Sequence, residues 1–175
     1  MHIRIFLILL VSVVATLFQL GQFAPSSIAA TFAGKVLSIV DGDTLNISCN
    51  GNKEKIILYG IDCPELTQDY GRQARQFTDD LCWSKIVTVE ERGRDSHGRT
   101  IAIVYLPDGT NLNQELVRKG LAWWSDKYAP TDAELKQLHL AAKAAHAGLW
   151  AAPNPIPPWI FRNGQKTVQA TIKSK

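Results

Sequence analysis

Hydrophobic and polar positions alternate over several short stretches of the chain, and this two-residue period is typical of half-buried β-strands. The turn residues Asn50-Gly51-Asn52 separate the second stretch from the third, so the first three strands are predicted to form an antiparallel meander. The five predicted strands are Phe32 to Val40, Leu45 to Cys49, Lys55 to Ile61, a strand that begins at Ile86, and Thr100 to Leu106.

Three other segments have the periodicity of amphipathic helices. The first contains Ala74, Phe77 and Leu81 and lies between the third and fourth strands. The other two are bounded by capping and stop residues: Asn111 and Gly120 for the second, and Thr131, Glu134 and Gly148 for the third. This order predicts an α+β fold, a five-stranded OB-fold Greek-key β-barrel with about three helices, although strand count alone leaves other α+β folds open.

The N-terminal segment, residues 1–29, has the pattern of a secretory signal peptide. His2 and Arg4 precede an apolar run from Ile5 to Leu20, and small residues follow. Ser27-Ile28-Ala29 fits the small-x-small rule, so cleavage after Ala29 and a secreted or periplasmic location are expected. An uncleaved membrane anchor is the alternative, because the run is close to the shortest spanning length.

The composition changes again after Trp150. A length of 175 residues indicates one domain, which we place at residues 30–152. Residues 153–175 form a proline-rich extension whose prolines favour extended geometry. Trp159 to Phe161 are expected to pack on the barrel, and the chain after Gln165 is expected to be frayed. A proline-rich ligand for a partner is the other interpretation of this extension.

Charge and cysteine content narrow the functional classes only a little. The formal net charge of +3 and the pI near 8.8 are compatible with a nucleic-acid partner without requiring one. The three cysteines allow at most one intrachain disulfide, for which Cys49–Cys82 is the predicted pair, and three reduced thiols are the alternative. No Cys/His spacing indicates a zinc site.

Two short motifs contain three carboxylates that are candidates for binding a metal ion or activating a water. Asp43 lies in Asp41-Gly42-Asp43-Thr44, and the other two lie in Ile61-Asp62-Cys63-Pro64-Glu65. Clustered carboxylates bind Ca²⁺ or Mg²⁺, and a further carboxylate beside such a metal can position or deprotonate a water. With Arg99 available to balance anionic charge, the pattern indicates metal-assisted hydrolysis of a phosphodiester. Each residue alone has a plain alternative as a turn former, a strand exit or a surface ion pair.

In these motifs, and in Gly98-Arg99, the chain resembles the staphylococcal (micrococcal) nuclease family. The similarity continues through most of the remaining chain, in an order that matches the family. The further matching segments are Tyr70-Gly71 before the Phe77 helix, Asn113 to Ala122, Lys127 to Pro130, Gly148 to Trp150 and the proline-rich tail.

The resemblance implies an OB-fold barrel that cleaves DNA, RNA or both with one Ca²⁺ ion. By position, Asp43 and Asp62 would be metal ligands through their carboxylates, and Cys63 would contribute its backbone carbonyl. Glu65 would orient or deprotonate the attacking water, and Arg99 would contact the scissile phosphate. The resemblance further implies a nucleic-acid substrate, and we expect a monomer with no stable membrane association after signal cleavage.

Three other residues are candidates for supporting roles, two of them by the same resemblance. Asp41 would support the metal site without binding the ion. Tyr128 could stack on a base or sugar, with a packed tyrosine as the alternative. His97 stands where relatives often have tyrosine, so its role does not come from the resemblance: a protonated imidazole could donate to a phosphate, and an ordinary loop histidine is the alternative.

The chain departs from the family at one position of consequence. The family carries a second catalytic arginine five residues before the aspartate of the Asp-x-Pro-Glu motif, and this chain has Ile57 there. Lys55 shares the strand face of Ile57 and could partly replace that cation, without the planar fork of an arginine. Arg72 and Arg75 are other candidates. His97 and Ser125-Asp126 are smaller departures that weaken substrate contacts.

Two interpretations therefore remain open. In the first, the protein is a secreted nuclease that is active but slow because Ile57 has replaced an arginine. In the second, it is a catalytically degenerate module that binds nucleic acid or another ligand without cleaving it. The position of a cation near Ile57 distinguishes them.

Overall fold

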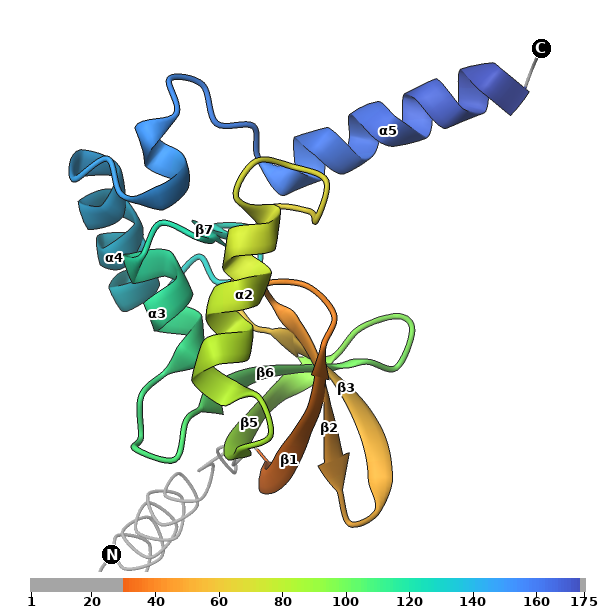
Figure 1. The fold of residues 1–175 in the computed structure, drawn as a ribbon, viewed down its shortest axis with the longest axis vertical. Helices are drawn as coiled ribbons and strands as arrows, with labels where there is room; N and C mark the ends of the chain where they lie inside the picture. The colour runs from red at the N-terminus through yellow and green to blue at the C-terminus, as the bar shows by residue number, and fades with distance from the viewer. Residues whose placement is uncertain (1–29, 174–175) are drawn as a thin grey trace, which may run out of the picture.

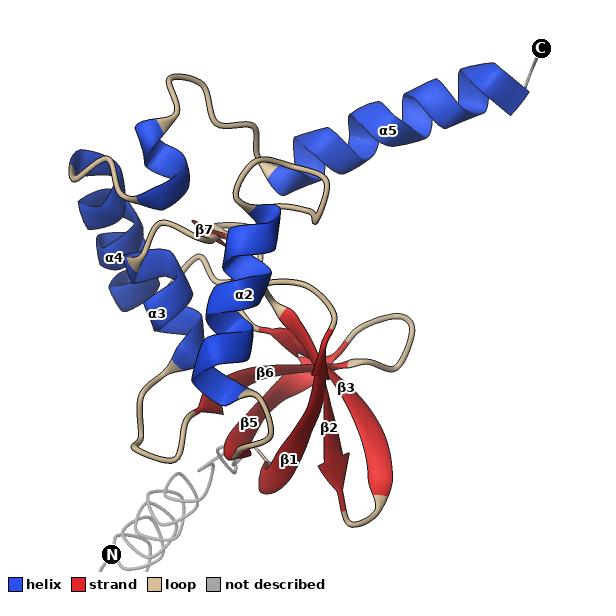
Figure 2. Cartoon of the chain, viewed as in Figure 1, coloured by secondary structure: helices blue, strands red, loops and turns tan. Residues whose placement is uncertain are grey.

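The computed structural model describes residues 30–173, with side chains to residue 165, and the predicted signal segment lies outside this range. Five strands close into a barrel in the order β1-β2-β3-β6-β5 (Figures 1 and 2). Only the β3–β6 pair is parallel, and the other pairs are antiparallel. The barrel strands are β1 (Thr31–Ile39), β2 (Thr44–Cys49), β3 (Asn52–Leu58), β5 (Ile86–Arg94) and β6 (Thr100–Tyr105).

The helices gather at one end and one side of the barrel (Figure 1). Helix α2 leads from the barrel end into β5, and α3 and α4 pack on one another. Helix α5 contacts the domain through its first residues and then extends outward. Their bounds are α2 (Gly71–Cys82), α3 (Leu112–Arg118), α4 (Ala133–Ala144), the 3₁₀ helix η1 (Gly148–Ala151) and α5 (Pro158–Lys173). The fold is therefore the predicted α+β barrel of OB type.

The third predicted strand is divided in two. β3 ends at Leu58, and Gly60 adopts a φ of +76° that turns the chain away from the barrel. Ile61–Asp62 then form β4, which pairs with β7 (Trp123–Trp124) in a separate two-stranded sheet. This turn, which the alternating pattern did not reveal, places Asp62 at the barrel end.

Two predicted helix limits are corrected by the capping geometry. Helix α4 is capped by Asp132, whose carboxylate accepts a hydrogen bond from the backbone N–H of Leu135, and not by Thr131. Its end is set by His146, with a φ of +49°, before Gly148 is reached. The predicted cap at Asn111 is confirmed, since its side chain accepts from the N–H of Gln114.

The proline-rich extension is only partly extended. Residues 153–157 contain no helix, but Pro158 begins α5. Proline is suited to the first position of a helix because the N–H groups of the first turn have no hydrogen-bond partner within the helix. The helix continues to Lys173, through a segment that we expected to be frayed. Among the described residues no helix has the length and apolarity needed to cross a bilayer.

The predicted disulfide is absent. Cys49, Cys63 and Cys82 are all free thiols. Cys49 lies beside the β2–β3 turn, whereas Cys82 is buried at the end of α2, where its thiol donates to the carbonyl of Thr78. The prediction of this disulfide rested on both side chains facing the core. Two side chains can face the same core and still lie too far apart to form a disulfide.

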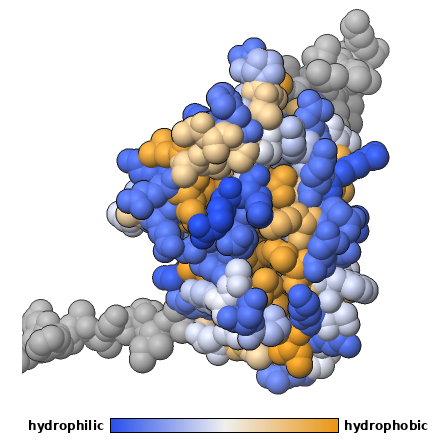
Figure 3. All heavy atoms as spheres, turned by 60° about the vertical axis from the view of Figure 1, so that its left-hand side comes forward, coloured by the Kyte–Doolittle hydropathy of each residue, from blue (hydrophilic) through white to orange (hydrophobic). Residues whose placement is uncertain are grey.

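The barrel core is apolar, and the surface carries both apolar and polar side chains. Leu45, Ile47 and Ile56 are fully buried, as the alternating pattern predicts. On the face turned forward in Figure 3, apolar side chains form a band with hydrophilic side chains on both sides.

Asn113 of α3 is a buried polar link between the helix and the barrel. It is 1% exposed, and its amide donates to the carbonyls of Tyr59 and Ala102 and accepts from the N–H of Val104. Asn113→Ala should lower the free energy of unfolding by about 3 kcal/mol, because buried backbone groups lose their partners. Urea unfolding measures this, and the exposed Asn154→Ala should be nearly neutral. Equal stability of the two variants would contradict the assignment.

Candidate functional site

The turn between β1 and β2 holds the first carboxylate motif in a fixed shape. Asp41 accepts the backbone N–H of Asp43, at 3.1 Å, through its side chain. The carbonyl of Gly42 accepts a 2.6 Å hydrogen bond from the hydroxyl of Thr78 on α2. A Cβ at Gly42 would collide with Cys63 and Ala74, so glycine lets the turn lie directly against the second motif.

The second motif leaves β4 and is joined to the first by a hydrogen bond. The backbone N–H of Cys63 donates to the Asp43 carboxylate at 2.6 Å. The following bend is closed by Gln68, whose side chain accepts from the N–H of Glu65 and whose N–H donates back to the Glu65 carbonyl. Gly71 then approaches the Glu65 carbonyl so closely that a Cβ would overlap it. The Glu65 backbone is therefore held on both sides.

The four carboxylates of the two motifs share this small volume, and their charges interact. Burial raises the pKa of Asp43 well above its usual range, and the neighbouring charge of Asp41 raises it further. Burial raises the pKa of Asp62 as well, although hydrogen bonds from Arg162 act in the opposite direction. Burial also raises the pKa of the Cys63 thiol well above its usual value, which keeps that thiol protonated. The cluster is an environment that a cation would stabilise.

Arg99 lies across from these carboxylates, at the start of β6. Its Nε donates to Asp95 at 2.6 Å, and its backbone N–H donates to the same carboxylate at 2.8 Å. Desolvation raises the pKa of Asp95, but the hydrogen bonds from Arg99 outweigh it and lower the pKa to about 2. Asp95 is thus ionised at neutral pH and orients the guanidinium.

These groups line one cavity of about 660 Å³. The cavity is bounded by the β1–β2 turn, β4 and the loop before β6. The predicted residues in its lining are Asp41, Asp43, Asp62, Cys63, Glu65, His97, Arg99 and Tyr128. The side chain of His97 is 77% exposed and that of Tyr128 is also exposed, which leaves both accessible at the rim.

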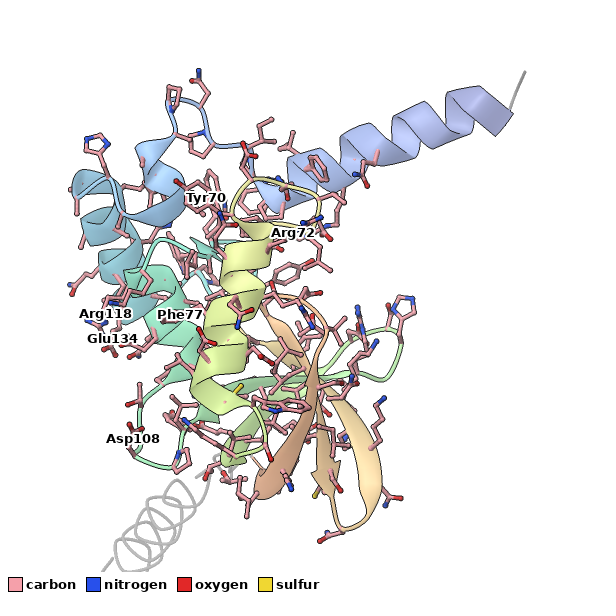
Figure 4. The ribbon with its side chains drawn as sticks, in the orientation of Figure 1. Tyr70, Arg72, Phe77, Asp108, Arg118 and Glu134 are labelled. Atoms are coloured by element: carbon pink, nitrogen blue, oxygen red, sulfur yellow. The ribbon has the colours of Figure 1, made fainter. Side chains whose placement is uncertain are left out.

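Lys55 is the predicted site residue that the cavity does not include. Ile57 lines the wall, whereas Lys55 is exposed nearer the β2–β3 turn and is not among the lining residues. Arg75 donates to the carbonyl of Ile39, and Arg72 lies at the start of α2, beside a different hollow (Figure 4). None of the three proposed substitutes for the missing arginine of β3 reaches this cavity.

Arg162 is the site residue that the sequence did not indicate. It comes from the second turn of α5, and its guanidinium donates to both oxygens of Asp62 and to one oxygen of Glu65. The Asp62 contact joins positions 100 residues apart, which no local pattern reveals. The available signal was helical spacing, because Arg162 lies three residues after Trp159, an aromatic residue expected to pack on the domain.

The donor set suits a hard divalent cation. Among the described residues, no group of three or more His, Cys, Asp or Glu side chains is arranged to hold a metal ion. An ion here would therefore be held by the carboxylates of Asp43 and Asp62 together with backbone and water oxygens, as Ca²⁺ and Mg²⁺ accept. The buried, mutually repelling carboxylates fit such an ion.

The fold and the site together define a five-stranded OB-type barrel with a cavity at one end that carboxylates and arginines line. The family model for staphylococcal nuclease homologues matches residues 55–152. An uncharacterized endonuclease of Escherichia coli O157:H7 is 40% identical over 136 residues, which are 78% of this chain and 88% of the relative. A micrococcal nuclease of Shigella flexneri is 37% identical over 146 residues, covering 78% and 84% of the two chains. The chain belongs to the staphylococcal nuclease family.

Proposed function

We propose that this protein is a calcium-dependent nuclease that hydrolyses phosphodiester bonds of DNA, RNA or both. The observation that carries the proposal is the hydrogen bond from Cys63 to Asp43, which fixes the two carboxylate motifs against one another in the cavity that also holds Glu65. The family of the chain and the names of its relatives support a nuclease. The N-terminal pattern supports export, and we further propose that the protein acts as a monomer.

Each residue of the cavity has a role that follows from its chemistry. Asp43, Asp62 and the Cys63 carbonyl would hold the ion, and Asp41 would keep Asp43 in place through its backbone N–H. Bound Ca²⁺ would supply positive charge that polarises the phosphate. Glu65 would take the proton of the attacking water. The water oxygen would then bond to phosphorus while the P–O bond on the opposite side of the phosphorus breaks. Arg99 would stabilise the negative charge that develops on the phosphate oxygens.

Removal of the metal tests this proposal. Cleavage of single-stranded DNA, duplex DNA and RNA should occur with Ca²⁺ and be lost in excess chelator. Asp43→Asn should weaken Ca²⁺ binding at least about tenfold in titration calorimetry, because a buried charged ligand is lost. Asp108→Asn, in the turn after β6 and away from the cavity (Figure 4), should bind Ca²⁺ like the native chain. Undiminished cleavage in chelator would overturn the proposal.

A further inference from the structure

The guanidinium of Arg162 lies between two carboxylates that have different roles in the proposed reaction. Nη1 and Nη2 donate to the two oxygens of Asp62 at 3.0 and 2.7 Å, which is a bidentate pair. Nη1 also donates to Glu65 at 2.8 Å. Arg162 therefore spans the distance between a candidate metal ligand and the candidate base, where a reacting phosphate must also lie.

A built scaffold holds Arg162 in this position. Asp62 pairs in register with Trp123 across the β4–β7 sheet. Trp123 packs edge-on against Trp159 with ring centroids 5.6 Å apart, and Trp159 precedes Arg162 by one helical turn. The side chain of Gln68, which also fixes Glu65, donates to the carbonyl of Ile156 just before α5. The same residues therefore position both carboxylates and the arginine between them.

The cavity needs a cation at this place. An anionic phosphate that approaches the four carboxylates of the two motifs is repelled unless positive charge compensates it. The β3 wall offers only the apolar side chains of Ile57 and Leu58. Arg92 is paired with Glu90 at 2.8 Å, and Arg99 is held by Asp95 on the other side.

Arg162 has donors left for a substrate. Its three hydrogen bonds use three of the five N–H groups of a guanidinium, and among the described residues no acceptor takes the other two. Its side chain is 41% exposed and lines the cavity. A planar fork with two free donors matches the geometry of phosphate oxygens.

We propose that Arg162 binds the reacting phosphate of the substrate, so that helix α5 supplies the cation that strand β3 lacks. The inference rests on the proposed function for the identity of the substrate. It assigns the C-terminal extension a direct part in substrate binding. It also explains how a barrel with Ile57 in its wall keeps two arginines facing one phosphate.

The first test removes Arg162 and measures kinetics and binding separately. Arg162→Ala and Arg162→Gln should lower kcat/KM for single-stranded DNA by about 10- to 100-fold, and Arg162→Lys should restore only part of this. Arg118→Ala, which removes an arginine of α3 remote from the cavity (Figure 4), should stay within about twofold. Thermal unfolding checks that each variant is folded, and the glutamine variant, which keeps a polar side chain, keeps the test valid if the alanine variant is unstable.

The second test asks whether position 57 and position 162 supply the same interaction. Ile57→Arg in the Arg162→Ala background should recover at least about tenfold of the lost kcat/KM, since an arginine on β3 faces the same cavity. A purely structural role for Arg162 would not be rescued from β3. Native-like kinetics of Arg162→Ala would overturn the proposal, and faster cleavage would overturn it by showing that Arg162 blocks the carboxylates.

Binding distinguishes failure of this inference from failure of the proposed function. In the Glu65→Gln background, a fluorescein-labelled single-stranded oligonucleotide with Ca²⁺ should bind about tenfold more weakly when Arg162 is also replaced. If the native chain does not cleave but this loss of binding occurs, the nuclease proposal fails and the Arg162 site stands. If cleavage requires Glu65 but oligonucleotide affinity and kcat/KM do not change when Arg162 is replaced, only the inference about Arg162 fails.

Discussion

Glu65→Gln is expected to lower kcat for Ca²⁺-dependent DNA cleavage by about 10²- to 10⁴-fold, while substrate binding changes little. The loss is the usual contribution of a positioned general base, because an amide cannot accept the proton of the attacking water. The substitution keeps the side-chain size and an oxygen that can accept from Arg162. The Glu65 backbone is fixed by Gln68, so the bend should keep its shape. Single-turnover cleavage of a labelled oligonucleotide measures the chemical step.

The control for this variant is Glu115→Gln. Glu115 is paired with Arg118 on α3 and lies outside the cavity, so the same change of charge there should leave kcat unchanged. Thermal unfolding should show both variants folded. A Glu65→Gln variant that cleaves within about threefold of the native rate would exclude Glu65 as the base and would direct attention to another acceptor in the cavity.

The barrel was predictable because local signals agree with tertiary packing along most of the chain. The alternating residues of β2 are buried, and the Asn50-Gly51 turn makes the β2–β3 hairpin. One error lies where two neighbouring residues offered the same local chemistry. Asp132 caps α4 in place of Thr131 because both side chains have a capping oxygen, and only the backbone path selects between them.

The carboxylate side of the cavity was predictable for a different reason. Asp43, Asp62 and Glu65 lie in turns whose shape depends on residues a few positions away, so short motifs contain most of the information. The cationic side depends on long-range docking. Lys55 shares the strand face of Ile57, but two residues of strand rise, about 7 Å, carry it away from the cavity.

Arg162 could not be assigned from the sequence because its position depends on the packing of α5. A run of prolines suggested an extended tail, whereas Pro158 is the first residue of a helix. The Trp159 contact with Trp123 then turns that helix so that Arg162 faces Asp62. Ile57 of β3 and Arg162 of α5 line the same cavity, and only the folded chain brings these two positions together.

Arg99→Ala is expected to lower kcat/KM by about 10²- to 10³-fold, the usual cost of removing one group that stabilises transition-state charge. Arg99→Lys should recover only part of this loss, because an ammonium cannot reproduce the two parallel donors of a guanidinium. Steady-state cleavage of single-stranded DNA measures both variants.

The matched control for Arg99 lies on the preceding strand. Arg94 pairs with Glu91 and does not line the cavity, so Arg94→Ala removes the same charge from nearby and should stay within about twofold of the native rate. Asp95→Asn should have an intermediate effect, because it keeps Arg99 but removes the carboxylate that orients it. Equal losses for Arg94→Ala and Arg99→Ala would mean that both arginines act only through their positive charge. A specific contact of Arg99 with the phosphate would then be excluded.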